Sequence, residues 1–134
     1  MIRYLLDTNV WIDLLKRIDV AQSARLGYVG ADKVATCSVV WAELLHGALK
    51  YDRVEERTSA VTSLLDPYTS LPFDKVAAQR YALTRHDLEV RGEGMATNDL
   101  MIAAIALQHG LTLVTHDQAF SRITGLTIED WRTV

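Results

Sequence analysis

Ile2-Arg3-Tyr4-Leu5-Leu6-Asp7 is a short apolar run that ends in an acid, and it indicates a buried strand at the start of the chain. The apolar residues that follow are spaced for one face of a helix: Val10, Trp11, Leu14, Leu15 and Ile18. A strand followed at once by a helix is typical of an α/β fold, and the rest of the chain has to show whether this pattern continues.

The alternation continues to the end of the chain. Further strands are expected at 34–37, 68–71, 111–115 and 126–129, and a short helical stretch is expected before Gly30. Longer helices are expected at 40–51, 54–65, 74–91 and 100–107, with Asp66-Pro67, Gly92 and Gly110 as terminators. This order predicts an α/β fold, a three-layer α/β/α sandwich whose central parallel sheet has four to five strands.

Length and composition set the class of protein. The chain has 134 residues, which suffice for one domain, so residues 1–134 are expected to form a single unit. No apolar run approaches the roughly 18 residues of a membrane span, and the first residues do not resemble a secretory signal. Cys37 is the only cysteine, which rules out an internal disulfide and a cysteine-rich zinc site. A reducing, cytoplasmic setting is therefore expected.

The net charge of −3 argues against a protein that holds nucleic acid by its overall charge. The same balance is compatible with a nuclease whose acids gather in one site and are offset there by metal ions. Charge alone therefore leaves both possibilities open.

Four acids follow or flank the predicted strands. Asp7 closes the first strand, Asp117 follows the strand that ends at Thr115, and Glu43 and Asp99 lie in the first turns of two helices. Ligands of parallel α/β sheets bind in the crevice beyond the carboxyl ends of the strands. We therefore expect the four carboxylates to meet at one edge of the sheet.

A cluster of carboxylates repels itself unless it holds protons or a cation. Oxygen ligands without a histidine or cysteine pattern favour Mg²⁺, with Mn²⁺ as a plausible substitute. The chemistry expected from such a site is the attack of an activated water on a phosphodiester. His116 is the one histidine expected beside this site.

Four short motifs in this order resemble those of the PIN-domain ribonucleases, and more narrowly those of VapC-type toxins from bacterial toxin–antitoxin systems. They are Leu5-Leu6-Asp7-Thr8-Asn9, Glu43-Leu44-Leu45-His46-Gly47, Asn98-Asp99-Leu100-Met101-Ile102-Ala103-Ala104 and Leu113-Val114-Thr115-His116-Asp117. The likeness extends over essentially the whole chain, including the tail around Trp131.

The resemblance implies a Mg²⁺-dependent endoribonuclease that acts on RNA and is inhibited by a cognate antitoxin. The matching catalytic and metal-binding positions are Asp7, Glu43, Asp99 and Asp117, with Asn9, Thr115 and Ser38 as supporting polar residues. Family members are usually homodimers, and the resemblance implies the same here. Trp11, Ile12 and Leu15 are expected to form part of the surface that the antitoxin covers.

Two alternatives remain open at this stage. Asp7 could be the nucleophile of a phosphatase, although phosphatases of the haloacid-dehalogenase type require a second aspartate where Asn9 stands. The chain could also be a binding module for RNA or a protein partner that has kept the acidic cluster without turnover.

Overall fold

The computed structural model describes residues 1–132 and has a parallel sheet at its centre. Five strands lie in the order β3-β2-β1-β4-β5, and every neighbouring pair is parallel. The strands are β1 (Tyr4–Leu6), β2 (Val34–Cys37), β3 (Thr69–Leu71), β4 (Thr112–Val114) and β5 (Ile128–Glu129). The predicted parallel sheet of four to five strands is therefore confirmed, with five.

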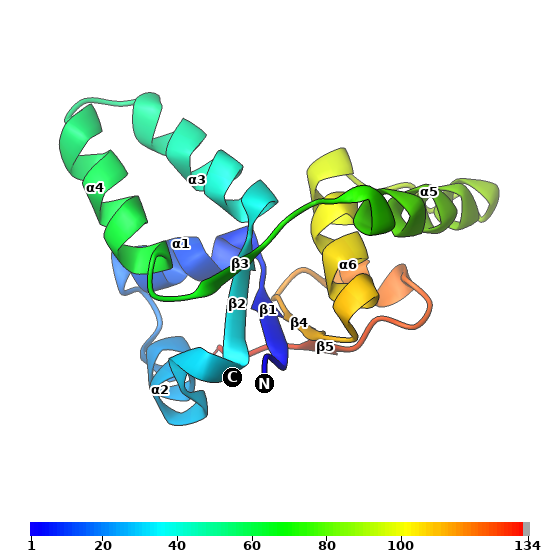
Figure 1. The fold of residues 1–134 in the computed structure, drawn as a ribbon, viewed down its shortest axis with the longest axis horizontal. Helices are drawn as coiled ribbons and strands as arrows, with labels where there is room; N and C mark the ends of the chain where they lie inside the picture. The colour runs from blue at the N-terminus through cyan, green and yellow to red at the C-terminus, as the bar shows by residue number, and fades with distance from the viewer. Residues whose placement is uncertain (133–134) are drawn as a thin grey trace.

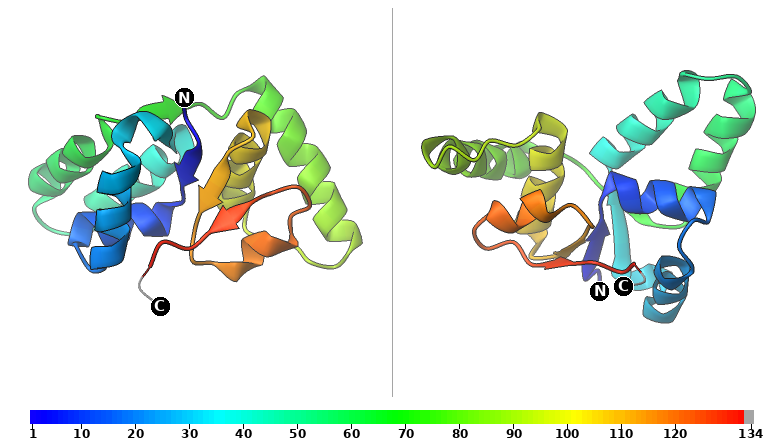
Figure 2. Two further views of the ribbon diagram at one scale, coloured as in Figure 1. Left: turned by 90° about the horizontal axis from the view of Figure 1, so that it is seen from below. Right: turned by 180° about the vertical axis from the view of Figure 1, so that it is seen from behind.

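Helices cover both faces of this sheet. They are α1 (Thr8–Lys16), α2 (Val20–Val29), α3 (Ser38–Leu49), α4 (Val54–Leu65), α5 (Lys75–Val90) and α6 (Thr97–His109), with the 3-10 turns η1 (Ala31–Lys33) and η2 (Gln118–Arg122). Figure 1 shows α1, α3 and α4 on one side of the strands and α5 with α6 on the other, and the view from behind in Figure 2 agrees. The fold is the expected three-layer sandwich.

Local signals set the helix ends. Asp74 caps α5 as predicted, because its carboxylate accepts a hydrogen bond of 2.9 Å from the backbone N–H of Ala77. Gly110 ends α6 in the left-handed conformation, with φ of 63°. Helix α6 begins at Thr97, three residues before the expected start, so Asp99 lies within its first turn.

The core lies where the central strands meet α1 and α6. Strand β1 is buried over its whole length, and six residues of α6 are buried, which confirms the closely packed helix that its small side chains predict. Trp11 is completely buried, and its indole N–H donates a hydrogen bond to the carbonyl of Leu6. The expectation that Trp11 belongs to a partner surface is therefore wrong, because its side chain packs into the core. Within residues 1–132 no helix is long and apolar enough to span a membrane.

The strand order places a reversal point between β1 and β4. From β1 the chain builds the sheet outward through β2 and β3, then returns through α5 and α6 to add β4 on the other side of β1. The backbone N–H of Asp7 bonds the carbonyl of Val114 at 3.0 Å, so the two strands end side by side. Ligand crevices of parallel sheets form at such reversal points.

Candidate active site

Asp7 is the most enclosed of the four predicted acids. It follows β1 directly and caps α1, and only 4% of its surface is exposed. One carboxylate oxygen accepts the backbone N–H of Asn9 at 2.9 Å, and the other accepts the hydroxyl of Thr115 at 2.5 Å. Burial raises the pKa of Asp7 above its usual value, although these two hydrogen bonds act in the opposite direction.

Glu43 reaches the site from α3 and is held by two neighbouring helices. One carboxylate oxygen accepts the hydroxyl of Thr8, at the start of α1, at 2.7 Å. The other accepts the side-chain amide of Asn98, in the first turn of α6, at 2.6 Å. This carboxylate therefore connects α3 with the first turns of α1 and α6.

The pKa of Asp99 depends on its burial and on the charges of the other three acids. Its pKa is raised to about 6, first because it is partly buried and then because of the negative charges of Asp7, Asp117 and Glu43. Its carboxylate makes no hydrogen bond with the rest of the described chain. The other three predicted acids thus lie close enough to Asp99 to act on it electrostatically.

Asp117 lies at the exposed rim of the cluster. Its carboxylate accepts the backbone N–H of Ala119 at 2.9 Å and so caps the turn η2. Its own backbone N–H donates to the hydroxyl of Thr115 at 3.0 Å. Thr115 therefore connects the buried acid Asp7 with the exposed acid Asp117.

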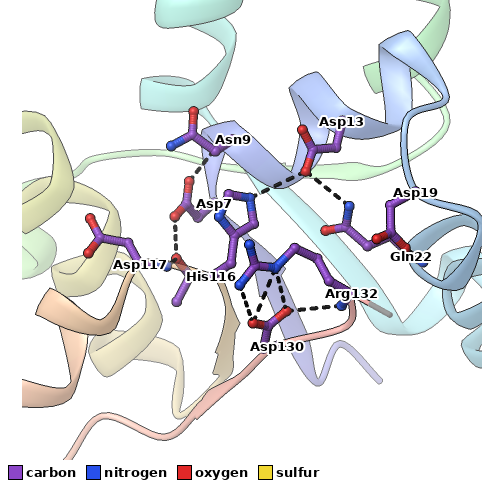
Figure 3. Close-up of polar contacts among 10 residues, drawn as sticks. Asp7, Asn9, Asp13, Asp19, Gln22, His116, Asp117, Asp130 and Arg132 are labelled. Carbon is purple, nitrogen blue, oxygen red and sulfur yellow. Dashed lines mark hydrogen bonds and ion pairs between the residues drawn. The ribbon is translucent and has the colours of Figure 1, made fainter. Parts of the chain in front are cut away.

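The structure gives the other predicted supporting residues different contacts. Asn9 bonds Asp7 through its backbone, and its side chain points away from Asp7 in Figure 3. The hydroxyl of Ser38 accepts the backbone N–H of Phe73 at 3.1 Å and thus bonds the segment after β3, not an acid. Thr8 and Asn98 were not predicted, although each precedes or follows a predicted acid within its motif. Direct adjacency to Asp7 and Asp99 was the signal that could have found them.

His116 lies beside the acids, as expected, and belongs to a second polar group (Figure 3). Its Nε2 lies 3.3 Å from a carboxylate oxygen of Asp13, and the fully buried Gln22 donates to the same oxygen at 3.1 Å. The electrostatic interaction with His116 acts to lower the pKa of Asp7, against the larger effect of burial. Asp130 and Arg132 pair with each other nearby at 2.7 Å.

The donor set at the edge suits a hard divalent cation. All four acids supply oxygen, and the repulsion that adds to the effect of burial on the pKa of Asp99 is the kind that a cation relieves. Within residues 1–132, no three acidic, histidine or cysteine side chains are arranged so that together they could hold a metal ion. Mg²⁺ commonly needs only one or two carboxylates, because it keeps several of its waters and binds substrate phosphates. The residues therefore fit such an ion without forming a closed cage.

Comparisons with known proteins agree with this architecture. Residues 4–126 match the family model of the PIN domain. The chain is 31% identical over 132 residues to ribonuclease VapC2 of Haemophilus influenzae, which covers 98% of this chain and 99% of the relative. It is 30% identical over 132 residues to the tRNA(fMet)-specific endonuclease VapC of Shigella flexneri, with the same coverage.

Solved structures agree as well. The crystal structure of DNA-bound VapBC from Salmonella typhimurium contains a chain that superimposes with a TM-score of 0.93 at 30% identity, covering 98% of this chain and 99% of that one. VapBC2 from Rickettsia felis, bound to a DNA fragment from its promoter, gives a TM-score of 0.90 at 30% identity with the same coverage. With its parallel sheet, its four acids at one edge and this likeness over nearly the full length, the chain belongs to the PIN-domain family and, within it, to the VapC ribonucleases.

Proposed function

We propose that this protein is a Mg²⁺-dependent endoribonuclease toxin that hydrolyses RNA phosphodiester bonds at the edge formed by Asp7, Glu43, Asp99 and Asp117. The observation that carries the proposal is that four carboxylates from distant parts of the chain gather at one edge of the sheet, where Asp99 is partly buried and close enough to the other three for their charges to act on it. A site that concentrates negative charge in this way is suited to a cation and, through the cation, to a phosphate. The names of the relatives support RNA as the substrate.

The acids have different tasks in this proposal. Asp7 is fixed by two hydrogen bonds and Glu43 by two more, so both present their remaining lone pairs in defined directions. Asp99, free of such bonds within residues 1–132, can turn toward a ligand and orient the attacking water. Asp117 completes the cluster at the exposed rim, where an RNA chain has access. When bound there, Mg²⁺ lowers the pKa of a bound water and stabilises the charge that develops on the phosphoryl oxygens.

Cleavage of a short RNA by the purified protein tests this function. We expect product with Mg²⁺ or Mn²⁺, none with excess EDTA, and none from the Asp99→Asn variant. Cleavage that is unaffected by EDTA would contradict the metal dependence. A small phosphomonoester serves as a second substrate, and its hydrolysis without RNA cleavage would favour a phosphatase. Tight binding of RNA without any product would favour the binding module instead.

An antitoxin partner is the second part of the proposal. The crystallised relatives are VapBC complexes, in which the toxin is bound to its antitoxin. A cavity of about 610 Å³ opens between the end of α1, α2 and the end of α4, lined by apolar side chains that include Leu14, Leu26, Leu64 and Tyr68. Arg17 and Asp19 also line it. We assign this cavity, in place of the buried Trp11, to an apolar segment of the cognate antitoxin, whose binding inhibits the nuclease.

The homodimer that the family resemblance implies remains a prediction. Light scattering on the purified toxin, and on its complex with the antitoxin, measures the mass of each species. A mass of about twice 15.0 kDa for the free toxin is the expected result.

A further inference from the structure

Glu43 has both of its carboxylate oxygens occupied by side chains of other helices. The hydroxyl of Thr8 donates to one oxygen at 2.7 Å and the amide of Asn98 donates to the other at 2.6 Å. Distances this short are typical of hydrogen bonds to a charged acceptor. The partners are 35 and 55 residues away in sequence, so the arrangement exists only in the folded chain.

Without these two bonds Glu43 would have little to define its orientation. A glutamate side chain has several rotatable bonds, and ordering it costs conformational entropy that a ligand would otherwise have to supply. Glu43, Thr8 and Asn98 are all only partly buried, so packing alone does not fix them. The two donors therefore set the direction of the carboxylate before any ligand arrives.

Asn98 also couples Glu43 to its neighbour in the chain. Asn98 and Asp99 are consecutive residues in the first turn of α6, so the bond from Asn98 to Glu43 ties the turn that carries Asp99 to Glu43. Thr8 has the same relation to Asp7, because the two are consecutive at the start of α1. Each of the two donors thus links Glu43 to another acid of the cluster.

We propose that Thr8 and Asn98 are positioning residues that orient Glu43 for metal binding and turnover. This inference rests on the proposed function and adds residues that act through Glu43 without touching the substrate. Residues that orient metal ligands are typically worth about 10- to 100-fold in metal affinity or activity. We expect losses in this range when either donor is removed.

The test uses shape-preserving variants of the full chain. Thr8→Val and Asn98→Leu remove the donors, whereas Thr8→Ser keeps the hydroxyl. Thr97→Val is the matched control, since Thr97 is exposed, lies next to Asn98 on α6 and makes no side-chain hydrogen bond with the rest of the described chain. Electron paramagnetic resonance of free Mn²⁺ measures the dissociation constant of the ion, and kinetics on a short RNA give kcat and KM separately.

For Thr8→Val and Asn98→Leu we expect a Mn²⁺ dissociation constant about 10-fold higher or more and a lower kcat, with the KM for RNA nearly unchanged. Thr8→Ser and Thr97→Val should behave like the wild type. In a Glu43→Gln background, the Thr8→Val substitution should have almost no further effect, because both changes act on one carboxylate.

Two results would overturn the inference separately from the function. Wild-type Mn²⁺ affinity and kcat in a folded Thr8→Val or Asn98→Leu variant would contradict the positioning role while leaving the nuclease intact. Equal losses in Thr8→Ser and Thr8→Val would also contradict it, because they would point to a steric cause. A wild-type protein that neither binds Mn²⁺ nor cleaves RNA would overturn the proposed function and this inference together. Circular dichroism and thermal unfolding confirm that each variant is folded.

Discussion

The hydroxyl of Thr115 donates a hydrogen bond of 2.5 Å to the carboxylate of Asp7, which lies 108 residues earlier in the chain. Both residues are almost completely buried, so water does not compete for this bond. The same hydroxyl oxygen accepts the backbone N–H of Asp117 at 3.0 Å. One small side chain at the end of β4 thereby fixes one acid directly and places a second through its backbone.

Replacing Thr115 by valine tests the role of these two hydrogen bonds. The change keeps the shape of the side chain but leaves an oxygen of Asp7 and the N–H of Asp117 without their partner. Losing such buried hydrogen bonds costs about 1–3 kcal/mol of unfolding free energy. The loss of orientation should lower RNA cleavage about 10- to 100-fold. Urea unfolding and single-turnover cleavage measure the two effects.

Thr36 offers a matched control on β2, which lies on the other side of β1 from β4. It is also fully buried, but its hydroxyl has no hydrogen-bond partner in the part of the chain described by the structure. Thr36→Val should therefore leave stability unchanged or raise it, without an effect on cleavage. Equal losses in the two variants would show that Thr115 contributes by packing alone.

Asp7→Asn should abolish cleavage and preserve the fold. Asparagine caps helices about as well as aspartate, so the hydrogen bond to the backbone N–H of Asn9 and the start of α1 should persist. The variant nevertheless removes a negative charge from the proposed metal site, and a rate loss of at least about 100-fold is expected. Gel-based RNA cleavage with circular dichroism as the folding control checks both statements. Wild-type cleavage by a folded Asp7→Asn protein would contradict the role of Asp7.

The sequence was sufficient to predict the fold and the edge of the sheet at which the four acids lie, because both depend on strong local signals. Strand β2 and helix α4 have the bounds that their apolar spacing and terminators predict, and Asp7 and Asp117 follow their strands directly. The contacts that orient the acids were harder to predict. Thr8 and Asn98 reach Glu43 across three helices, and no periodic pattern encodes such a bond.

For Trp11 the sequence predicted a position on a partner surface that the structure does not give it. Its spacing places it on the apolar face of α1, but spacing alone does not distinguish a face that packs on the sheet from one that a partner covers. Only the three-dimensional structure shows that Trp11 is completely buried and that its indole N–H donates a hydrogen bond to the carbonyl of Leu6.

Val20 provides a test of the antitoxin cavity that spares the core. Its side chain is 81% exposed and lines the cavity at the first turn of α2, where an added acid favours the helix. Val20→Asp should weaken binding of the cognate antitoxin about 10-fold or more, because a charge in an apolar contact must be desolvated. RNA cleavage by the free toxin should not change. Calorimetric titration of the toxin with its antitoxin measures the affinity.

Tyr28→Asp is the control for that measurement. Tyr28 lies on the same helix and is 87% exposed, but it does not line the cavity. Wild-type affinity for this control together with a loss for Val20→Asp would place the antitoxin at the cavity. Wild-type affinity for both variants would assign the antitoxin to another surface.

The raised pKa of Asp99 makes the stability of the metal-free protein depend on pH. Its pKa is about 6 in the folded protein and 3.8 as an ordinary aspartate, so folding favours the protonated form. The resulting stabilisation is complete below about pH 4 and is lost as the pH rises through 6. Burial shifts the pKa of Asp7 in the same direction. In EDTA the stability of the wild type should therefore be reduced most at neutral pH, where Asp99 and Asp7 have to be charged.

Asp99→Asn removes this loss of stability, because the amide does not become charged as the pH rises. In EDTA at pH 7.5 the variant should unfold about 3–5 °C above the wild type, and the difference should shrink toward zero near pH 4. Added Mg²⁺ should raise the unfolding temperature of the wild type, since it binds only the folded state, but not that of the variant. Thermal scans from pH 4 to pH 8, with and without the ion, measure both effects. A pH-independent difference between the two proteins would mean that the charge of Asp99 is opposed neither by its burial nor by the other acids, and the electrostatic basis of the proposed site would be lost.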